Sequence, residues 1–222
     1  AMVLKASEER SGVLSSLVRS DGSGGDLLMI PAGGSHTPAS IQSVQQGLHY
    51  IQMNGREVFR FATRVVDKAT REVVEKAGLT LDDIQLFVPH QANLRIIQAA
   101  ARTLELTDDR IFVNLDRYGN TSSASIPIAL CEAVEGGRIK PGDKIVLVGF
   151  GAGLTWAAAT IEWGVPEPLH QPNLAIRMAR IAIYPLAAAR SRGAKVLRRI
   201  EGQLFGPPSP KRIDEDGKKK RD

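Results

Sequence analysis

The side chains best suited to chemistry are a histidine and an amide that follow two separate apolar segments. His90 lies in the run Pro-His-Gln-Ala-Asn, directly after the apolar residues 84–88. Asn120 lies in the run Gly-Asn-Thr-Ser, shortly after the apolar residues 111–113. If both apolar segments are strands of one α/β sheet, their carboxyl ends place both side chains at the edge where ligands collect. The spacing therefore predicts an imidazole and a carboxamide presented to one reacting group.

Each of these residues also has an ordinary structural explanation. A lone histidine is more often structural than catalytic, and Asn120 suits a left-handed turn or the cap of a helix that begins near Thr121. A third segment, Gly-Ala-Gly at residues 151–153, lies between two apolar runs. Its small residues allow close backbone packing, and they also leave N–H groups open to a ligand, as in an oxyanion hole. The residues alone leave these alternatives open.

The single cysteine, Cys131, falls inside the helix that we expect after Asn120. A thiolate several turns beyond Asn120 would not point at His90, so we exclude Cys131 as a nucleophile. We expect it to be a small buried or half-buried packing residue. One cysteine also excludes a disulfide framework and fits a reducing, cytoplasmic setting. The residues that could do chemistry thus resemble half of an active site.

Alternating strands and helices must position these side chains, and the pattern predicts a layered α/β fold. The apolar runs predict strands at residues 13–19, 84–88, 111–113, 144–150 and 154–163. Helical spacing predicts helices at residues 58–77, at 92–104, and from Asn120 to about 136, with Gly78 as a stop signal, a capped turn at 80–83 and a turn at 141–143.

The composition is that of an ordinary globular protein, with 43% hydrophobic and 24% charged residues in 222. No apolar run approaches the roughly 20 residues that span a bilayer, and no signal-peptide pattern is present. Residues 1–6 look like a strand already under way, which favours a truncated gene product. The net charge of +5 is concentrated after Pro166, so basic character says little about the core.

Four parts are expected along the chain. They are the end of an N-terminal half (1–19), a C-terminal half-domain (20–164), a linker with a basic amphipathic helix (165–204) and a disordered tail (205–222). The prolines and arginines of the last two parts are typical of a solvated extension. Contact with an anionic membrane or with nucleic acid is the alternative for this tail, and we expect no nucleic acid.

Several long motifs, in order, resemble β-ketoacyl-acyl carrier protein synthase III, the initiating condensing enzyme of bacterial fatty-acid synthesis. They are VPHQANLRII at 88–97, DRYGNTS at 116–122 and GRIKPGD at 137–143, with shorter similarity in MNGREVF at 53–59 and SDGS at 20–23. The similarity extends over about residues 1–163. It implies a thiolase-like layered α/β fold, of which this chain would be the C-terminal half. The complete protein would be a cytoplasmic homodimer.

The resemblance implies an acyltransferase with a Cys-His-Asn triad and no metal or cofactor. Acyl-CoA would load the cysteine, and His90 and Asn120 would hydrogen-bond the thioester carbonyl of malonyl-acyl carrier protein during decarboxylative condensation. The backbone N–H of Ala152 would hold the second oxyanion, although the family usually carries glycine there. The nucleophile belongs to the family's N-terminal half, so we expect this chain alone to be inactive.

The resemblance also implies a tunnel for the pantetheine arm, lined by Gly55, Phe59 and Asn93. Arg60 and Arg95 would lie at its mouth, where they would meet the acidic carrier protein or a CoA phosphate. A solvated helix face is the simpler explanation for both arginines.

Two other functions stay open for this sequence. A non-catalytic half-domain would bind an acyl carrier protein or a partner half. A related condensing enzyme of secondary metabolism would carry the same motifs.

Overall fold

A computed structural model describes residues 2, 6, 11–164, 190 and 193. Residues 1–166 belong to one compact unit, and the rest of the chain to a second. Apart from residues 190 and 193, the expected basic helix and tail lie outside the described residues, as does most of the strand expected at 1–6. In the described part, no helix combines the length and apolarity needed to cross a membrane.

The regular elements of the first unit alternate between strands and helices, as the sequence predicts. In chain order they are β1 (Gly12–Ser20), the 3-10 helix η1 (Gly22–Leu27), β2 (Leu28–Met29), α1 (Ile41–Gln45), β3 (Gln52–Met53), α2 (Gly55–Lys76), η2 (Leu81–Asp83), β4 (Leu86–Pro89), α3 (Leu94–Thr103), η3 (Asp108–Arg110), α4 (Leu115–Tyr118), η4 (Ser122–Ala124), α5 (Ser125–Glu135), β5 (Lys144–Gly151) and β6 (Thr155–Glu162).

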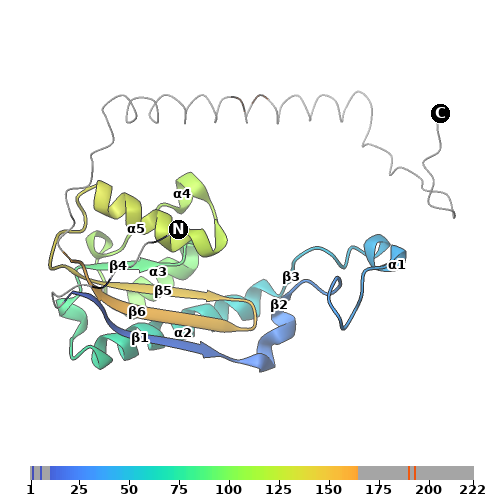
Figure 1. The fold of residues 1–222 in the computed structure, drawn as a ribbon, viewed down its shortest axis with the longest axis horizontal. Helices are drawn as coiled ribbons and strands as arrows, with labels where there is room; N and C mark the ends of the chain where they lie inside the picture. The colour runs from blue at the N-terminus through green and yellow to red at the C-terminus, as the bar shows by residue number, and fades with distance from the viewer. Residues whose placement is uncertain (1, 3–5, 7–10, 165–189, 191–192, 194–222) are drawn as a thin grey trace. The chain divides into compact units, whose positions relative to one another are not determined.

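A mixed sheet in the order β1-β6-β5-β4 forms the centre of this unit (Figure 1). β4 and β5 are parallel, whereas β6 is antiparallel to both β5 and β1. The sequence predicts that residues 1–19 are the end of an N-terminal half. Because β1, which includes the strand predicted at 13–19, pairs with β6 over its length, it shares a sheet with the body. The division between residues 19 and 20 stays a prediction.

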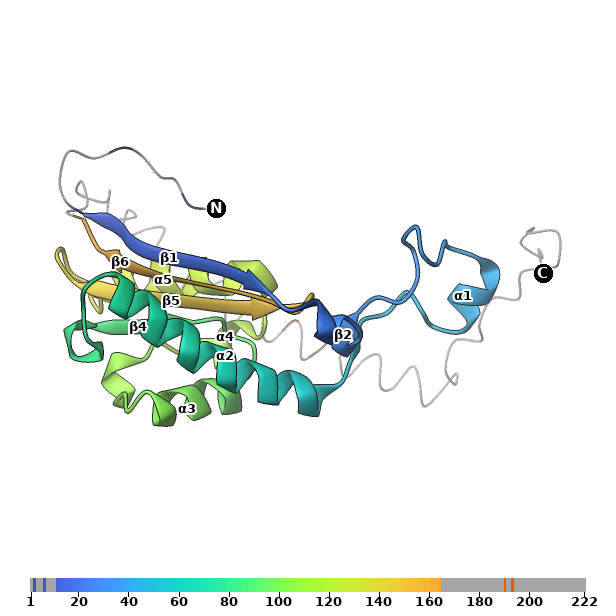
Figure 2. The ribbon, with the colours of Figure 1, turned by 90° about the horizontal axis from the view of Figure 1, so that it is seen from below.

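Helices cover both faces of the sheet. Figure 1 shows α5 and α2 on opposite sides, and Figure 2 shows α3 beside α2. Phe87 and Val146 pack with the buried residues of α2 and α3, while their chain neighbours Leu86 and Ile145 pack with those of α5. This alternation follows from the two-residue period of a strand. The layered α/β prediction is therefore confirmed.

The helix α2 confirms the strongest helix prediction and its stop before Gly78, although it begins at Gly55, three residues before the predicted start. The side chain of Asn54 caps it by accepting a hydrogen bond from Glu57 N at 3.3 Å. Gly78, just past its end, has a φ of +73°, a conformation that glycine adopts without steric cost.

Three local expectations differ from the structure. Residues 111–113 are not a strand, since Ile111 makes only an isolated bridge to Phe87 before Asn114 turns the chain into α4. The glycine-rich residues 22–27, for which no helix is predicted, form the 3-10 helix η1, capped by Asp21. The sequence analysis did not find α1, which lies with β2 and β3 on an arm that extends beyond the sheet strands (Figure 1).

Candidate active site

His90 lies where β4 ends, at the carboxyl end of the parallel pair. Its backbone N–H donates to Val148 O of β5 at 2.7 Å, which continues the strand pairing by one residue. Its ring is half-buried and lies edge-on to Phe150, with the centroids 5.4 Å apart. Burial lowers the pKa of His90 below the ordinary value of 6.5. The imidazole is therefore neutral at pH 7, in which state it has one N–H donor and one acceptor nitrogen.

Ser125, the first residue of α5, contacts His90 directly. Its hydroxyl oxygen lies 2.5 Å from His90 Nδ1 and 3.3 Å from the backbone nitrogen of Gln91. Ser125 is 2% exposed, so this contact is shielded from water. Ser125 was not predictable from the sequence, because a serine in a run of serines gives no sign of a partner 35 residues away.

Asn120 lies in the turn that leads into α5. Its Oδ1 accepts a hydrogen bond from Ser122 N at 2.9 Å, which leaves the Nδ2 hydrogens to donate elsewhere. The left-handed explanation for Asn120 is wrong, whereas its side chain does accept the first backbone N–H of η4, as the capping explanation expects. The left-handed residues are Gly119 and Ser122, and the helix caps are Thr121 for η4 and Ala124 for α5.

Ala152 lies in the turn between β5 and β6, two residues beyond the phenylalanine that contacts His90. It is exposed, and its carbonyl accepts a hydrogen bond from Thr155 Oγ1 at 3.0 Å. Gly153 beside it has a φ of +133°, and a Cβ there would meet the Thr155 side chain at 2.7 Å. This turn therefore requires glycine at 153, whereas 152 has room for alanine.

A buried glutamine joins the segments that lead to His90 and Asn120. Gln91 is 1% exposed. Its Nε2 donates to Pro89 O at 2.8 Å and to Phe112 O at 3.1 Å, and its Oε1 accepts from Asn114 N at 3.1 Å. The sequence analysis assigned no role to this residue. A glutamine between an apolar strand and an apolar helix was the available signal.

The residues expected along the pantetheine tunnel lie at the N-terminal ends of α2 and α3. The Arg95 guanidinium lies over the Phe59 ring, 5.9 Å from its centroid, which brings the two helix ends together. Asn93 caps α3 by accepting from Arg95 N at 2.9 Å. Gly55, the first residue of α2, is exposed, and Arg60 forms an exposed ion pair with Glu57 at 3.1 Å.

Cys131 is exposed, so the expectation that it is buried or half-buried is wrong. Position 131 falls on the outward side of α5, where its Sγ contacts Glu135 Oε1 at 3.7 Å. Six residues separate it from Ser125, which corresponds to about 9 Å along a helix axis. This geometry agrees with its exclusion as the partner of His90.

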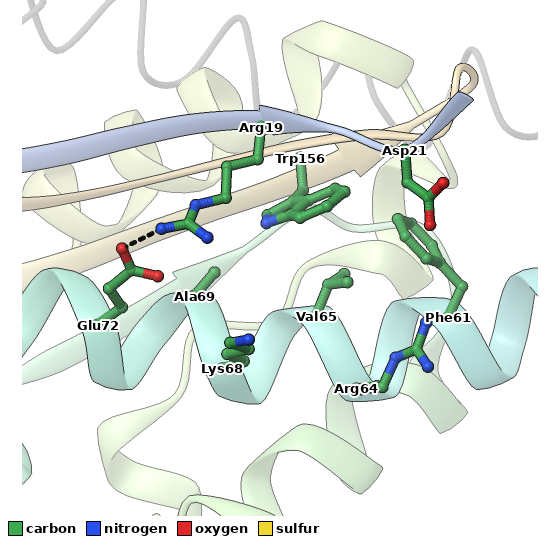
Figure 3. A pocket seen from close by; sticks show the side chains of 9 residues that line it. All are labelled: Arg19, Asp21, Phe61, Arg64, Val65, Lys68, Ala69, Glu72 and Trp156. Atoms are coloured by element: carbon green, nitrogen blue, oxygen red, sulfur yellow. Dashed lines mark hydrogen bonds and ion pairs between the residues drawn. The ribbon is translucent and has the colours of Figure 1, made fainter. Parts of the chain in front are cut away.

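The described body also has a cavity of about 290 Å³ between β1 and α2 (Figure 3). Trp156 and Phe61 form its apolar wall, and Arg19 crosses it to pair with Glu72 at 2.5 Å. A second cavity of about 360 Å³ includes Arg60 in its lining. Neither His90 nor Asn120 is among the residues that line these two cavities.

Comparison with known proteins assigns the family. Residues 74–163 match the family model described as 3-oxoacyl-[acyl-carrier-protein (ACP)] synthase III C terminal. A β-ketoacyl-[acyl-carrier-protein] synthase III of Symbiobacterium thermophilum is 58% identical over 74% of this chain and 50% of its own length.

Solved structures give the same result. The synthase III of Thermus thermophilus has a TM-score of 0.63 at 52% identity, over 72% of this chain and 48% of that one. The priming β-ketosynthase of the R1128 polyketide pathway has a TM-score of 0.60 at 35% identity, over 72% and 47%. The chain spans about half the length of the curated relatives that it matches. Over this length, the chain corresponds to the C-terminal half of a member of the β-ketoacyl-[acyl-carrier-protein] synthase III family.

Proposed function

We propose that this chain supplies the malonyl-decarboxylating side of a β-ketoacyl-acyl carrier protein synthase III active site. The observation that carries the proposal is that the His90 ring contacts both Ser125, which begins the helix after the Asn120 turn, and Phe150, which lies two residues before Ala152. Two relatives with the printed name of this synthase are 58% and 54% identical to this chain over 164 and 163 residues.

The chemistry follows from two neutral donors at one oxygen. A malonyl thioester loses CO₂ when its C–C bond breaks and the electron pair moves into the thioester carbonyl as an enolate. The His90 N–H and the Asn120 Nδ2–H stabilise that developing negative charge, and neither brings a negative charge of its own. The carbanion then attacks an acyl thioester on a cysteine, the thiolate leaves, and a β-ketoacyl thioester results.

The cysteine of this scheme comes from outside the printed sequence, because Cys131 is on the outward side of α5. The backbone N–H of Ala152 holds the oxyanion that forms when the carbanion attacks. The complete protein, meaning this chain together with an N-terminal half that carries the family's cysteine, is a homodimer and performs both steps.

The two substrates arrive through the N-terminal ends of α2 and α3. Phe59 and Arg95, held together there, form one wall of the pantetheine path, with Gly55 and Asn93 beside them. Arg60 and Arg95 attract the acidic carrier protein or the CoA phosphate. The exposure of both arginines suits a contact made outside the tunnel.

The proposal is tested by measuring the two half-reactions separately in the complete protein. We expect His90→Ala or Asn120→Ala to lower the release of CO₂ from malonyl-acyl carrier protein by about 10²–10³-fold, as for the loss of one oxyanion donor. Acyl transfer from acyl-CoA to the cysteine should stay within about threefold, since it needs neither donor.

Cys131→Ala is the control for this experiment, because an exposed thiol away from His90 should affect neither step. Equal loss of both half-reactions in His90→Ala and Asn120→Ala would contradict the roles proposed for them.

A second candidate is a priming synthase of polyketide biosynthesis, favoured by the similarity to the R1128 enzyme. It uses the same half-reactions, so a preference among acyl-CoA primers in the acyl-transfer assay distinguishes the two.

A further inference from the structure

We propose that Ser125 is a positioning residue that holds His90 in the tautomer with its proton on Nε2. The inference rests on the proposed function, because it explains how His90 becomes a donor to the thioester oxygen. It depends on the direction of two hydrogen bonds that meet at one hydroxyl.

The Ser125 hydroxyl has one hydrogen and can accept at its lone pairs. The backbone N–H of Gln91 can only donate, so at 3.3 Å the Ser125 oxygen is the acceptor. Of the two hydrogen-bond partners that the described residues give this hydroxyl, only His90 Nδ1, at 2.5 Å, is able to accept its hydrogen. With Ser125 donating, Nδ1 is an acceptor without a proton.

The tautomer follows from this assignment. A neutral imidazole carries one proton, and when Nδ1 is the acceptor that proton is on Nε2. Nε2 is the ring nitrogen that Ser125 does not contact, and in this tautomer it donates. In the opposite tautomer, Nε2 would direct a lone pair at the developing oxyanion and would oppose decarboxylation.

The groups that set this arrangement are rigidly held. Ser125 is 2% exposed and Gln91 is 1% exposed. Gln91 is fixed in turn by its side-chain bonds to Pro89 O, Phe112 O and Asn114 N. The Phe150 ring lies against the imidazole. Rotation of the serine hydroxyl away from Nδ1 would leave a shielded nitrogen unpaired, which is costly in a buried site.

The test is nitrogen NMR of the histidine rings in the full chain, with no substrate present. Long-range ¹H–¹⁵N correlation distinguishes a protonated from an unprotonated ring nitrogen, and His90→Gln identifies the His90 signals among the four histidines. At pH 7.5 we expect an unprotonated Nδ1 and a protonated Nε2. Ser125→Ala should lose this single-tautomer pattern, whereas Ser125→Thr, which keeps the hydroxyl, should retain it.

Ser123→Ala is the matched control, because Ser123 is an exposed serine of the same turn. The signals of His36 and His49 report whether each variant is folded. A protonated Nδ1 in the unchanged chain, or a tautomer that Ser125→Ala does not alter, would overturn the proposal. This result is independent of the proposed function, whose failure would appear as normal decarboxylation in His90→Ala.

Discussion

His90 has the two properties that a donor to a developing oxyanion requires. Burial keeps it neutral, and its Nδ1 already has a partner in Ser125, so Nε2 is left to face a substrate. The residue types were predictable from the sequence, because His90 and Asn120 each follow an apolar segment. Their partners were not, because Ser125 and Gln91 act through contacts that the order of residues does not reveal.

The lowered pKa of His90 gives a pH dependence with a definite sign. The unfolded chain protonates this histidine near pH 6.5, while the folded chain does so only at lower pH. Between these two pKa values the unfolded state binds more protons than the folded state. The free energy of unfolding therefore decreases as the pH falls through this window, and above pH 6.5 the protonation of His90 does not lower it. We expect the His90 ring protons to titrate with a midpoint below 6.5 in the full chain.

Comparison with His90→Gln checks the linkage by urea unfolding at several pH values. The difference between the two chains should change in the window below pH 6.5 and be constant above it. A midpoint at or above 6.5 in the NMR titration would show that the ring is not desolvated as described.

Cys131 allows a prediction that compares two positions of one helix. Cys131→Ser should change the free energy of unfolding by less than about 0.5 kcal/mol, because the side chain is exposed. Ala133→Ser, where the side chain is 0% exposed, should cost about 1–3 kcal/mol by burying a hydroxyl. Urea unfolding of both variants is the measurement, and equal effects would contradict the assigned faces of α5.

At the scale of elements, local signals decided which predictions were confirmed. The helix α2 was predictable because its apolar spacing, its Asn54 cap and its stop at Gly78 agree. Residues 111–113 were wrongly predicted as a strand because all three are apolar and of types common in strands, yet only Ile111 bridges to Phe87. The carbonyl of its neighbour Phe112 accepts a hydrogen bond from the Gln91 side chain, so this side chain replaces the backbone partner that a paired strand would supply. The short α1 has a capping box of two serines but too few apolar positions to show a period.

Gln91 is the link between elements that can be tested by a single substitution. Gln91→Ala leaves three backbone groups of the segments around β4 and α4 without their partner, and we expect a loss of about 2–4 kcal/mol in the free energy of unfolding. Gln98→Ala on the exposed side of α3 is the matched control, with an expected change below about 0.5 kcal/mol. Similar midpoints for the two variants in urea would refute the linking role of Gln91.

At the scale of the whole molecule, His90 and Asn120 line neither of the two cavities described above, of which one lies between β1 and α2 and the other between η1 and α2. Large apolar side chains are exposed elsewhere, including Val18 at 83% and Ile41 at 78%. The chain spans about half the length of the relatives that it matches, and the prediction that it carries one side of an active site stays a prediction.

The central claim is that His90 and Asn120 donate to the same thioester oxygen. The most direct measurement is a double-mutant cycle on CO₂ release from malonyl-acyl carrier protein by the complete protein, with His90→Ala, Asn120→Ala and the double variant. Two donors at one oxygen act as a unit, so we predict losses of about 10²–10³-fold for each single variant and a double-variant loss well short of their product. Losses that multiply fully would mean that the two side chains act independently, and a wild-type rate in either single variant would contradict the claim.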